Sequence, residues 1–318
     1  MARLAGQGVA GPSGPGPVQG VPPLSQHSCR ATLYDPPVLD HPLLLVLLGF
    51  VVGTAGTLIG AGGGFLLVPA LLLLDPQADP RSVTAISLAV VFANAVSGSL
   101  AYARTGRIDY RAGLAFALAT LPGAALGAWS TAWVSRGAFS ALFGALLVLL
   151  GLTLARPVRP VVSPTEALPP RAPSRSWWVR RWVDPQGAAH EWAFDVRIGV
   201  GLSLGIGYLS SLLGIGGGVV HVPALVHLLR FPVHVATATS QFTLVFTALT
   251  GTAVHVAGGE LSARPVLLEL ALLVAGVLPG AQVGARLAGR VRGKWILRVL
   301  ALALVLVGAR LIVAGLRG

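Results

Sequence analysis

Residues 60–74 read GAGGGFLLVPALLLL and place four glycines inside an apolar stretch. A second stretch, GIGGGVVHVPALVHLL at residues 214–229, repeats the first at an offset of 154 residues. Between residues 60–71 and 214–225, eight of twelve positions are identical, including the Gly-Gly-Gly run and the Val-Pro-Ala-Leu that follows it. Glycine in a helix interior is about 1 kcal/mol less favourable than alanine. Three glycines in succession therefore predict a helix break followed by a new, short helix.

The composition around these stretches is that of a membrane protein. Hydrophobic residues make up 54% of the chain and charged residues 11%, and the mean hydropathy is +0.77; soluble domains carry about 25% charged residues. Most apolar stretches approach the ~20 residues that a helix needs to cross a bilayer, and they are too continuously apolar for a transmembrane barrel. They are residues 42–59, 86–103, 113–134, 139–155, 198–213, 242–257, 266–285 and 296–316. We therefore expect an all-α, multi-pass protein of the cell membrane.

The formal net charge of +12 does not indicate a nucleic-acid partner. The positive residues lie between the apolar stretches, where lysine and arginine set the orientation of membrane helices. The single cysteine, Cys29, excludes a disulfide within the chain and a thiolate metal site. Neither glycine run has the G-x-G-x-x-G spacing of a dinucleotide site, because Phe65 and Val219 stand at the final glycine position. No nucleophile or metal set appears, so we expect no cofactor, no metal and no enzymatic activity.

The repetition extends beyond the glycine runs and predicts two homologous halves. Residues 83–109 align with residues 235–262, and PGAALG at 122–127 aligns with PGAQVG at 279–284. The predicted organisation is a disordered Pro/Gly-rich tail, a first transmembrane repeat, a polar linker and a second transmembrane repeat, at residues 1–41, 42–155, 156–195 and 196–318.

The predicted linker is rich in arginine and contains SWWVRRW at residues 176–182. Its positive charge favours a cytoplasmic location. Two interpretations are open for its tryptophans: they lie along the membrane interface, or the segment is an ordinary loop with a short amphipathic helix.

The number of spans in each half is also open. If the short helix after each break crosses the membrane, each half has five elements, and the odd number makes the second half inverted relative to the first. If it only dips in, each half has four. The distribution of cationic residues favours the inverted arrangement.

The breaks have the properties of an anion site. The first N–H groups of a helix lack partners, the helix dipole places about half a positive charge there, and glycine lets a ligand approach the backbone. Broken helices with such starts hold anions at the centre of transporters. Hydroxyl and amide side chains at the start of the next helix in each half add donors. The predicted substrate-binding residues are Gly62, Gly63, Gly64, Phe65, Ser87, Gly216, Gly217, Gly218, Val219, Thr239, Ser240 and Gln241.

Alternative roles are open for several of these residues. Pairs such as Gly49 and Gly53, or Gly280 and Gly284, are typical of close helix packing, whereas contiguous glycines weaken a helix more than packing requires. The Ser and Thr hydroxyls could instead bond to carbonyls of their own helices. His221 is a candidate for proton coupling.

On these residues the chain resembles the TauE/SafE-type sulfite exporter family. Each half carries G-x-GGG-(x)4-P-A-L after its first apolar stretch and a Ser/Thr-bearing stretch next, and the resemblance covers residues 42–316. It implies export, and in some members uptake, of sulfur oxyanions or organosulfonates such as sulfite or sulfoacetate, and of some carboxylates.

We therefore expect a secondary transporter that moves a small anion by alternating access between two repeats. The alternatives are an anion channel and an uptake permease for a carboxylate or other small solute. The sequence leaves open the anion, the direction of transport, the coupling ion and whether the chain forms a homo-oligomer.

Overall fold

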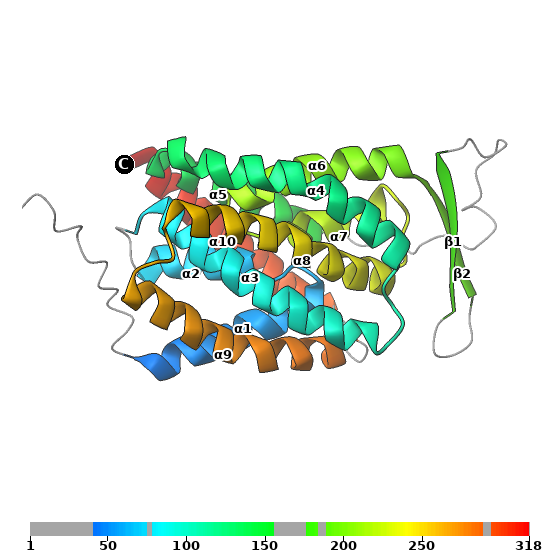
Figure 1. The fold of residues 1–318 in the computed structure, drawn as a ribbon, viewed down its shortest axis with the longest axis horizontal. Helices are drawn as coiled ribbons and strands as arrows, with labels where there is room; N and C mark the ends of the chain where they lie inside the picture. Colours follow the sequence, from blue (N-terminus) through cyan, green and yellow to red (C-terminus); the bar gives the residue numbers. More distant parts are fainter. Residues whose placement is uncertain (1–40, 75–77, 156–175, 184–188, 289–293, 318) are drawn as a thin grey trace, which may run out of the picture. The chain divides into compact units, whose positions relative to one another are not determined.

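The computed structural model describes residues 41–74, 78–155, 176–183, 189–288 and 294–317, all of which belong to one compact unit. The described chain is mostly helical, as predicted, and adds one two-stranded sheet (Figure 1). The first five helices are α1 Pro42–Ile59, α2 Gly64–Leu74, α3 Pro80–Ala103, α4 Tyr110–Ser130 and α5 Arg136–Ala155. The next five are α6 Val196–Leu212, α7 Gly218–His227, α8 Val233–Gly258, α9 Arg264–Leu287 and α10 Lys294–Arg317. The strands between them are β1 Trp177–Val183 and β2 Ala189–Asp195. The predicted tail and most of the predicted linker lie outside the described residues.

Five described helical segments are long and apolar enough to cross a membrane: Pro42–Ile59, Pro80–Ala103, Tyr110–Trp133, Arg136–Thr153 and Arg264–Leu287. Many of their large apolar side chains are exposed, among them Leu43, Leu118 and Leu149, as expected for surfaces that face lipid. Helix α4 carries exposed aromatic residues at both ends, Tyr110 at one and Trp129 at the other. At 1.5 Å per residue they lie about 30 Å apart, which matches the thickness of a bilayer's hydrocarbon core and the usual position of aromatic belts.

Close packing between helices depends on the paired glycines. Gly49 and Gly53 of α1 lie against backbone atoms of Leu273 and Val277 in α9. Gly123 and Gly127 of α4, and Gly280 and Gly284 of α9, likewise face the backbones of their partner helices, α6 and α1. A side chain at any of these positions would push the helices apart, so the packing role predicted for the spaced glycines is confirmed.

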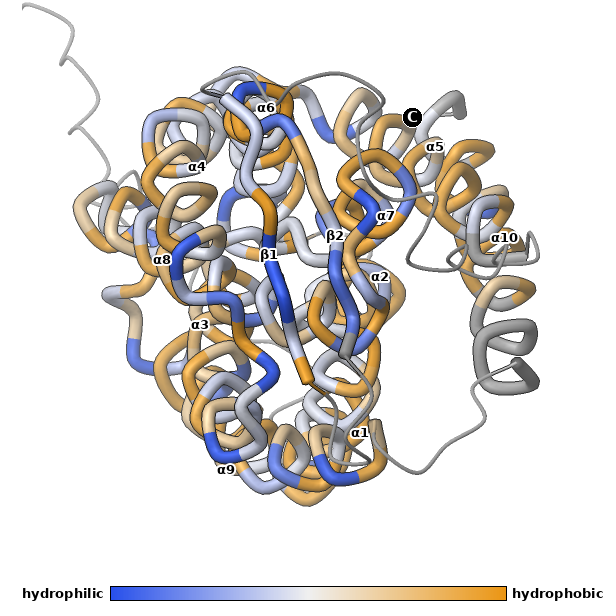
Figure 2. The backbone as a smooth tube through the Cα atoms, turned by 90° about the vertical axis from the view of Figure 1, so that its right-hand side faces the viewer, coloured by the Kyte–Doolittle hydropathy of each residue, from blue (hydrophilic) through white to orange (hydrophobic). Residues whose placement is uncertain are grey.

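The part of the predicted linker that the structure describes is a β-hairpin, which the sequence analysis did not predict. β1 and β2 pair antiparallel, with Trp177 opposite Asp195 and Val183 opposite Ala189. Neither the loop nor the amphipathic helix considered for this segment is present in its described residues. Figures 1 and 2 show the hairpin lying across the ends of the helices.

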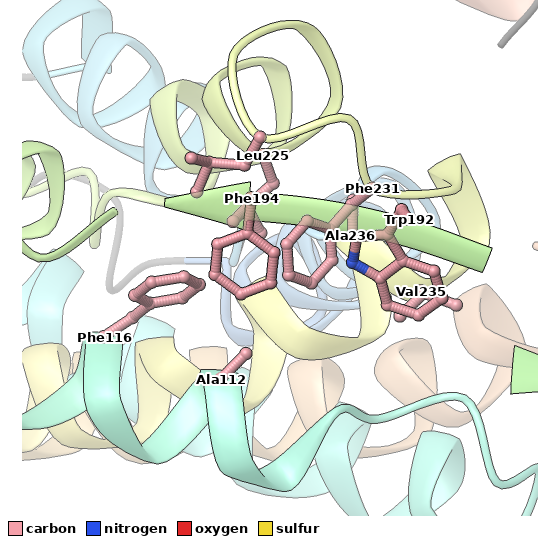
Figure 3. Close-up of a cluster of buried hydrophobic side chains, with 9 residues drawn as sticks. Ala112, Phe116, Trp192, Phe194, Leu225, Phe231, Val235 and Ala236 are labelled. Carbon is pink, nitrogen blue, oxygen red and sulfur yellow. The ribbon is translucent and has the colours of Figure 1, made fainter. Parts of the chain in front are cut away.

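Alternation along the strands gives the hairpin two faces. Val179 and Val183 are exposed, whereas Trp192 and Phe194 are buried. These two rings pack with Phe116 of α4 and Phe231 in a buried apolar cluster (Figure 3). The other buried members of the cluster are Ala112, Leu225, Leu229, Val235 and Ala236, and Trp178 and Trp182 pack against it. The tryptophans of β1 are therefore partly buried against protein.

Polar contacts fix the same face of the hairpin. Arg180 Nε and Nη2 donate to the two carboxylate oxygens of Asp109, each at 2.7 Å, and this hydrogen bonding raises the pKa of the guanidinium. Asp109 also accepts from Ala112 N at the start of α4. Trp182 Nε1 donates to the Gly106 carbonyl at 3.2 Å, and the Arg111 guanidinium lies 4.5 Å from the Trp178 ring centre.

We predict that Arg180→Ala lowers the free energy of unfolding by about 1–3 kcal/mol, because it leaves the buried Asp109 carboxylate without its bidentate partner. Thermal unfolding in detergent measures this change. Acrylamide quenching of tryptophan fluorescence should rise as well, because four of the seven tryptophans lie in the two strands.

Arg181→Ala is the matched control. Arg181 pairs with Glu191 at 3.7 Å, and their side chains are 67% and 47% exposed, so we expect a change below about 0.5 kcal/mol. Equal effects of the two substitutions would contradict the docking role of Arg180.

Candidate functional site

Both glycine runs break the helices where the sequence predicted. The first run ends α1 and precedes the 11-residue α2, and the second separates α6 from the 10-residue α7. Gly63 and Gly217 have φ values of 86° and 90°, a left-handed conformation that other residues rarely adopt. The chain can turn into each short helix because these positions are glycine.

The two breaks pack against each other, although about 150 residues separate them in the sequence. A Cβ on Gly64 would lie 2.6 Å from the Gly214 carbonyl oxygen, and one on Gly218 would lie 2.7 Å from Ala61 Cα. Gly62 and Gly216 both contact the side chains of Val91 and Leu244, from α3 and α8. All six glycines of the two Gly-x-Gly-Gly-Gly runs that were predicted to bind substrate are buried. The two glycine runs that were predicted to bind substrate therefore lie side by side.

Two serine hydroxyls connect the long helices to these breaks in a reciprocal way. Ser87 Oγ of α3 donates to the Gly214 carbonyl at 2.6 Å, and Ser240 Oγ of α8 donates to the Gly60 carbonyl at 3.2 Å. Each predicted serine thus reaches the break in the other half of the chain. Their hydrogens are engaged with carbonyl oxygens, so donation to an anion would require the hydroxyl to rotate.

The helix starts beside these serines present free peptide donors. Leu67 N donates to Gly63 O at 3.1 Å, and His221 N donates to Gly217 O at 2.8 Å. Within the described part of the chain, no backbone acceptor pairs with the N–H groups of Gly64, Phe65, Gly218 or Val219. Phe65 and Val219 are 1% and 4% exposed. The positive ends of α2 and α7 thus lie together in a buried environment.

Gln241 belongs to a buried polar cluster next to the first break. Its Nε2 donates to the Asn94 carbonyl at 3.2 Å and to Thr57 Oγ1 at 3.4 Å. Thr57 Oγ1 donates to Asn94 Oδ1 at 2.8 Å, and Tyr102 Oη donates to the Thr57 carbonyl at 2.8 Å. The cluster joins α1, α3 and α8.

Two of the predicted residues make their contacts elsewhere. Thr239 Oγ1 accepts from Asp109 N at 3.0 Å, at the start of α4. His221 is buried, with Nε2 3.3 Å from Ser203 Oγ and its ring 5.7 Å from that of Phe116. Thr239 therefore connects the site to the end of the bundle that the hairpin covers, and His221 lies beside the apolar cluster that contains Phe116.

The sequence analysis missed Thr57 and Asn94 as members of the polar cluster. A signal was present, because Asn94 is the only asparagine among the 318 residues and lies inside an apolar stretch. Polar residues in membrane helices usually bond across helices. Among the described residues, no group of three or more His, Cys, Asp or Glu side chains could hold a metal ion.

Comparisons with known proteins identify a family and several relatives. The family described as "Sulfite exporter TauE/SafE" matches residues 45–311. A "Probable membrane transporter protein YunE" of Bacillus subtilis is 30% identical over 282 residues, which cover 86% of this chain and 98% of that protein. A "Probable membrane transporter protein" of Xylella fastidiosa is 29% identical over 184 residues, covering 58% of this chain and 62% of the relative. One from Methanocaldococcus jannaschii is 26% identical over 213 residues, covering 65% and 70%.

No solved structure matches the chain at a significant level. The family match covers most of the chain, and together with the apolar helices it identifies a multi-pass membrane protein of a transporter family, not an enzyme. The chain belongs to the TauE/SafE sulfite exporter family of membrane transporters.

Proposed function

We propose that this protein is a secondary transporter that binds a small anion at the paired breaks and exports it by alternating access. The observation that carries the proposal is the meeting of two broken helices. The N–H groups at the starts of α2 and α7, which have no backbone acceptor among the described residues, belong to two breaks that pack together in a buried region. Peptide donors at helix starts suit an anion in a region that excludes water.

We further propose that the two halves are inverted repeats of five helices. The helix contacts support this idea: α1 packs on α9 as α6 packs on α4, while α3 packs on α8 and α5 on α10. If each of α1–α5 is exchanged for the helix five places later in α6–α10, the same set of packed pairs results. The reciprocal bonds of Ser87 and Ser240 follow the same exchange. Rocking of one half against the other would open the breaks alternately to each side.

Sulfite or an organosulfonate such as sulfoacetate is the proposed substrate, on the basis of the family. A carrier fits the site better than a channel does, since the buried backbones of the two breaks lie in direct contact. A channel would need a continuous path through this contact.

We predict that the protein reconstituted in proteoliposomes catalyses counterflow of radiolabelled sulfite. Internal unlabelled sulfite should drive transient accumulation of the label, and sulfoacetate, sulfate and acetate are tested as competitors. Saturable flux with counterflow indicates a carrier. Flux without saturation or counterflow indicates a channel, and no flux of any of these anions would contradict the proposed substrate class.

We predict that Ser87→Ala and Ser240→Ala each lower counterflow at least tenfold. Each substitution leaves a buried carbonyl of a break without its donor, which costs about 1–3 kcal/mol, and the break loses its defined shape. Thr250→Val is the matched control, because the Thr250 hydroxyl bonds only to Phe246 O of its own helix among the described contacts. Equal counterflow in all three variants would contradict the role of the serines.

His221 is the residue that we propose for proton coupling. Ser203 Oγ already donates to Gly199 O at 2.7 Å, so His221 Nε2 is the donor in their contact and its other ring nitrogen can accept a proton. We predict that His221→Gln abolishes accumulation driven by a pH gradient but retains counterflow, which needs no net proton movement. Loss of both activities together would indicate a structural role instead.

A further inference from the structure

The polar cluster beside the first break contains one donor and one acceptor that the protein leaves unused. Asn94 and Gln241 are both 0% exposed. Among the described residues, no hydrogen-bond partner is present for Asn94 Nδ2 or for Gln241 Oε1. Both side chains bond to the Thr57 hydroxyl through their other amide atom, so the unused donor and acceptor belong to neighbouring groups.

The hydrogen bonds of the cluster assign the oxygen and nitrogen atoms of the two side-chain amides. Gln241 presents Nε2 to the Asn94 carbonyl oxygen, and an amide oxygen at that position would repel it. Thr57 Oγ1 accepts from this same Nε2 and donates its own hydrogen to Asn94 Oδ1 at 2.8 Å. The Asn94 NH₂ group and Gln241 Oε1 are therefore the atoms left over.

The corresponding position in the other half lacks this pair. By the offsets of 153 and 154 residues, Gln241 corresponds to Leu88, Asn94 to Thr247 and Thr57 to Ser211. The surroundings correspond too: Gly98 faces Gln241 and Thr57, whereas Gly251 faces Leu88 and Ser211. Thr247 bonds instead to Thr120 of α4 and to the Thr243 carbonyl. The backbone arrangement is duplicated, but the amide pair occurs once.

An unpaired donor and acceptor in this location oppose folding. A buried polar group without a partner costs about 1–3 kcal/mol, and the hydrocarbon core around the protein offers no water to satisfy it. Leucine is accommodated at the corresponding position 88, so the helix packing does not demand an amide at 241. A ligand that pairs with both groups gives a physical reason for their presence.

We propose that Asn94 and Gln241 are substrate-binding residues that select anions carrying a hydroxyl or acid O–H group beside their acceptor oxygens. This inference rests on the proposed function and adds the class of anion. The Asn94 NH₂ group donates to an oxygen of the anion, and Gln241 Oε1 accepts from its O–H group.

The chemistry of the two groups sets the specificity. Hydrogen sulfite and hydroxyalkanesulfonates present both an acceptor and an O–H donor. Sulfite in its doubly charged form, sulfate and simple alkanesulfonates present only acceptors, so Gln241 Oε1 would face lone pairs or a methyl group. Sites that hydrogen-bond a substrate hydroxyl discriminate strongly against analogues that lack it.

The test uses two competitors of equal charge and similar size. Hydroxymethanesulfonate and ethanesulfonate differ by a hydroxyl in place of a methyl group, and both keep a single negative charge near neutral pH. In sulfite counterflow with the full chain, we expect hydroxymethanesulfonate to compete at a concentration at least tenfold lower. In the Gln241→Leu variant the two competitors should become equal within about twofold.

Gln282→Leu is the matched control variant. Gln282 of α9 also donates to α3, at the Ser97 carbonyl and hydroxyl, and lies outside the proposed pair. It should keep the preference for the hydroxylated competitor. If the Gln241→Leu variant does not insert into the membrane, Gln241→Asn replaces it. This variant retains an amide and should show a reduced preference for hydroxymethanesulfonate. Equal potency of the two competitors on the unaltered protein would overturn the proposal without any variant.

Thermal unfolding of the purified full chain separates this inference from the proposed function. Stabilisation by hydroxymethanesulfonate but not by ethanesulfonate supports the site even if no anion shows counterflow. If sulfite counterflow occurs but neither competition nor thermal stabilisation distinguishes the two compounds, the transporter proposal stands and the role of Asn94 and Gln241 is wrong.

Discussion

The packing of the two helix breaks against each other is the constraint on which the rest of the structure depends. Non-helical backbone within a membrane must be buried in protein or line a wet cavity, because lipid offers no hydrogen bonds. Here each break is covered by the other. Ser87 and Ser240 satisfy the carbonyls of Gly214 and Gly60, and α3 and α8 supply the Val91 and Leu244 side chains that contact both breaks. Each break is thus buried by residues from a distant part of the chain.

Local features of the sequence were sufficient to predict the breaks, most of the apolar helices and the close packing at spaced glycines such as Gly49 and Gly53. They were not sufficient to predict contacts between residues that lie far apart in the sequence. The bond from Ser87 to Gly214 joins residues 127 positions apart, and no local pattern specifies it. The polar cluster was missed because Asn94 lies among apolar residues, and its importance depends on Thr57 and Gln241 from two other helices. The hairpin was missed because the arginines in SWWVRRW masked an alternation in which Trp178, Arg180 and Trp182 share one face.

The hairpin connects the end of the bundle to the breaks through a short series of contacts. Arg180 binds Asp109, the Asp109 N–H donates to Thr239, and the next residue, Ser240, bonds to the Gly60 carbonyl. On the apolar side, Phe194 packs on Phe116, whose ring also contacts His221. A movement that separates α4 from α8 would therefore strain the docking of the hairpin. In the proposed transport cycle, the hairpin would therefore have to adjust whenever α4 and α8 move apart.

Duplication of the backbone and divergence of the side chains have different consequences for an anion site. Peptide N–H groups at helix starts attract any small anion, because every oxyanion presents acceptor oxygens. A symmetrical pair of breaks can therefore supply affinity and a site that opens to either side, but it cannot distinguish one oxyanion from another. Discrimination requires a group that tests for something only some anions possess. In the selection proposed above, the unpaired Gln241 Oε1 would be that group, because an acceptor favours anions that retain an O–H group, whereas the aligned Leu88 has no polar atom in its side chain.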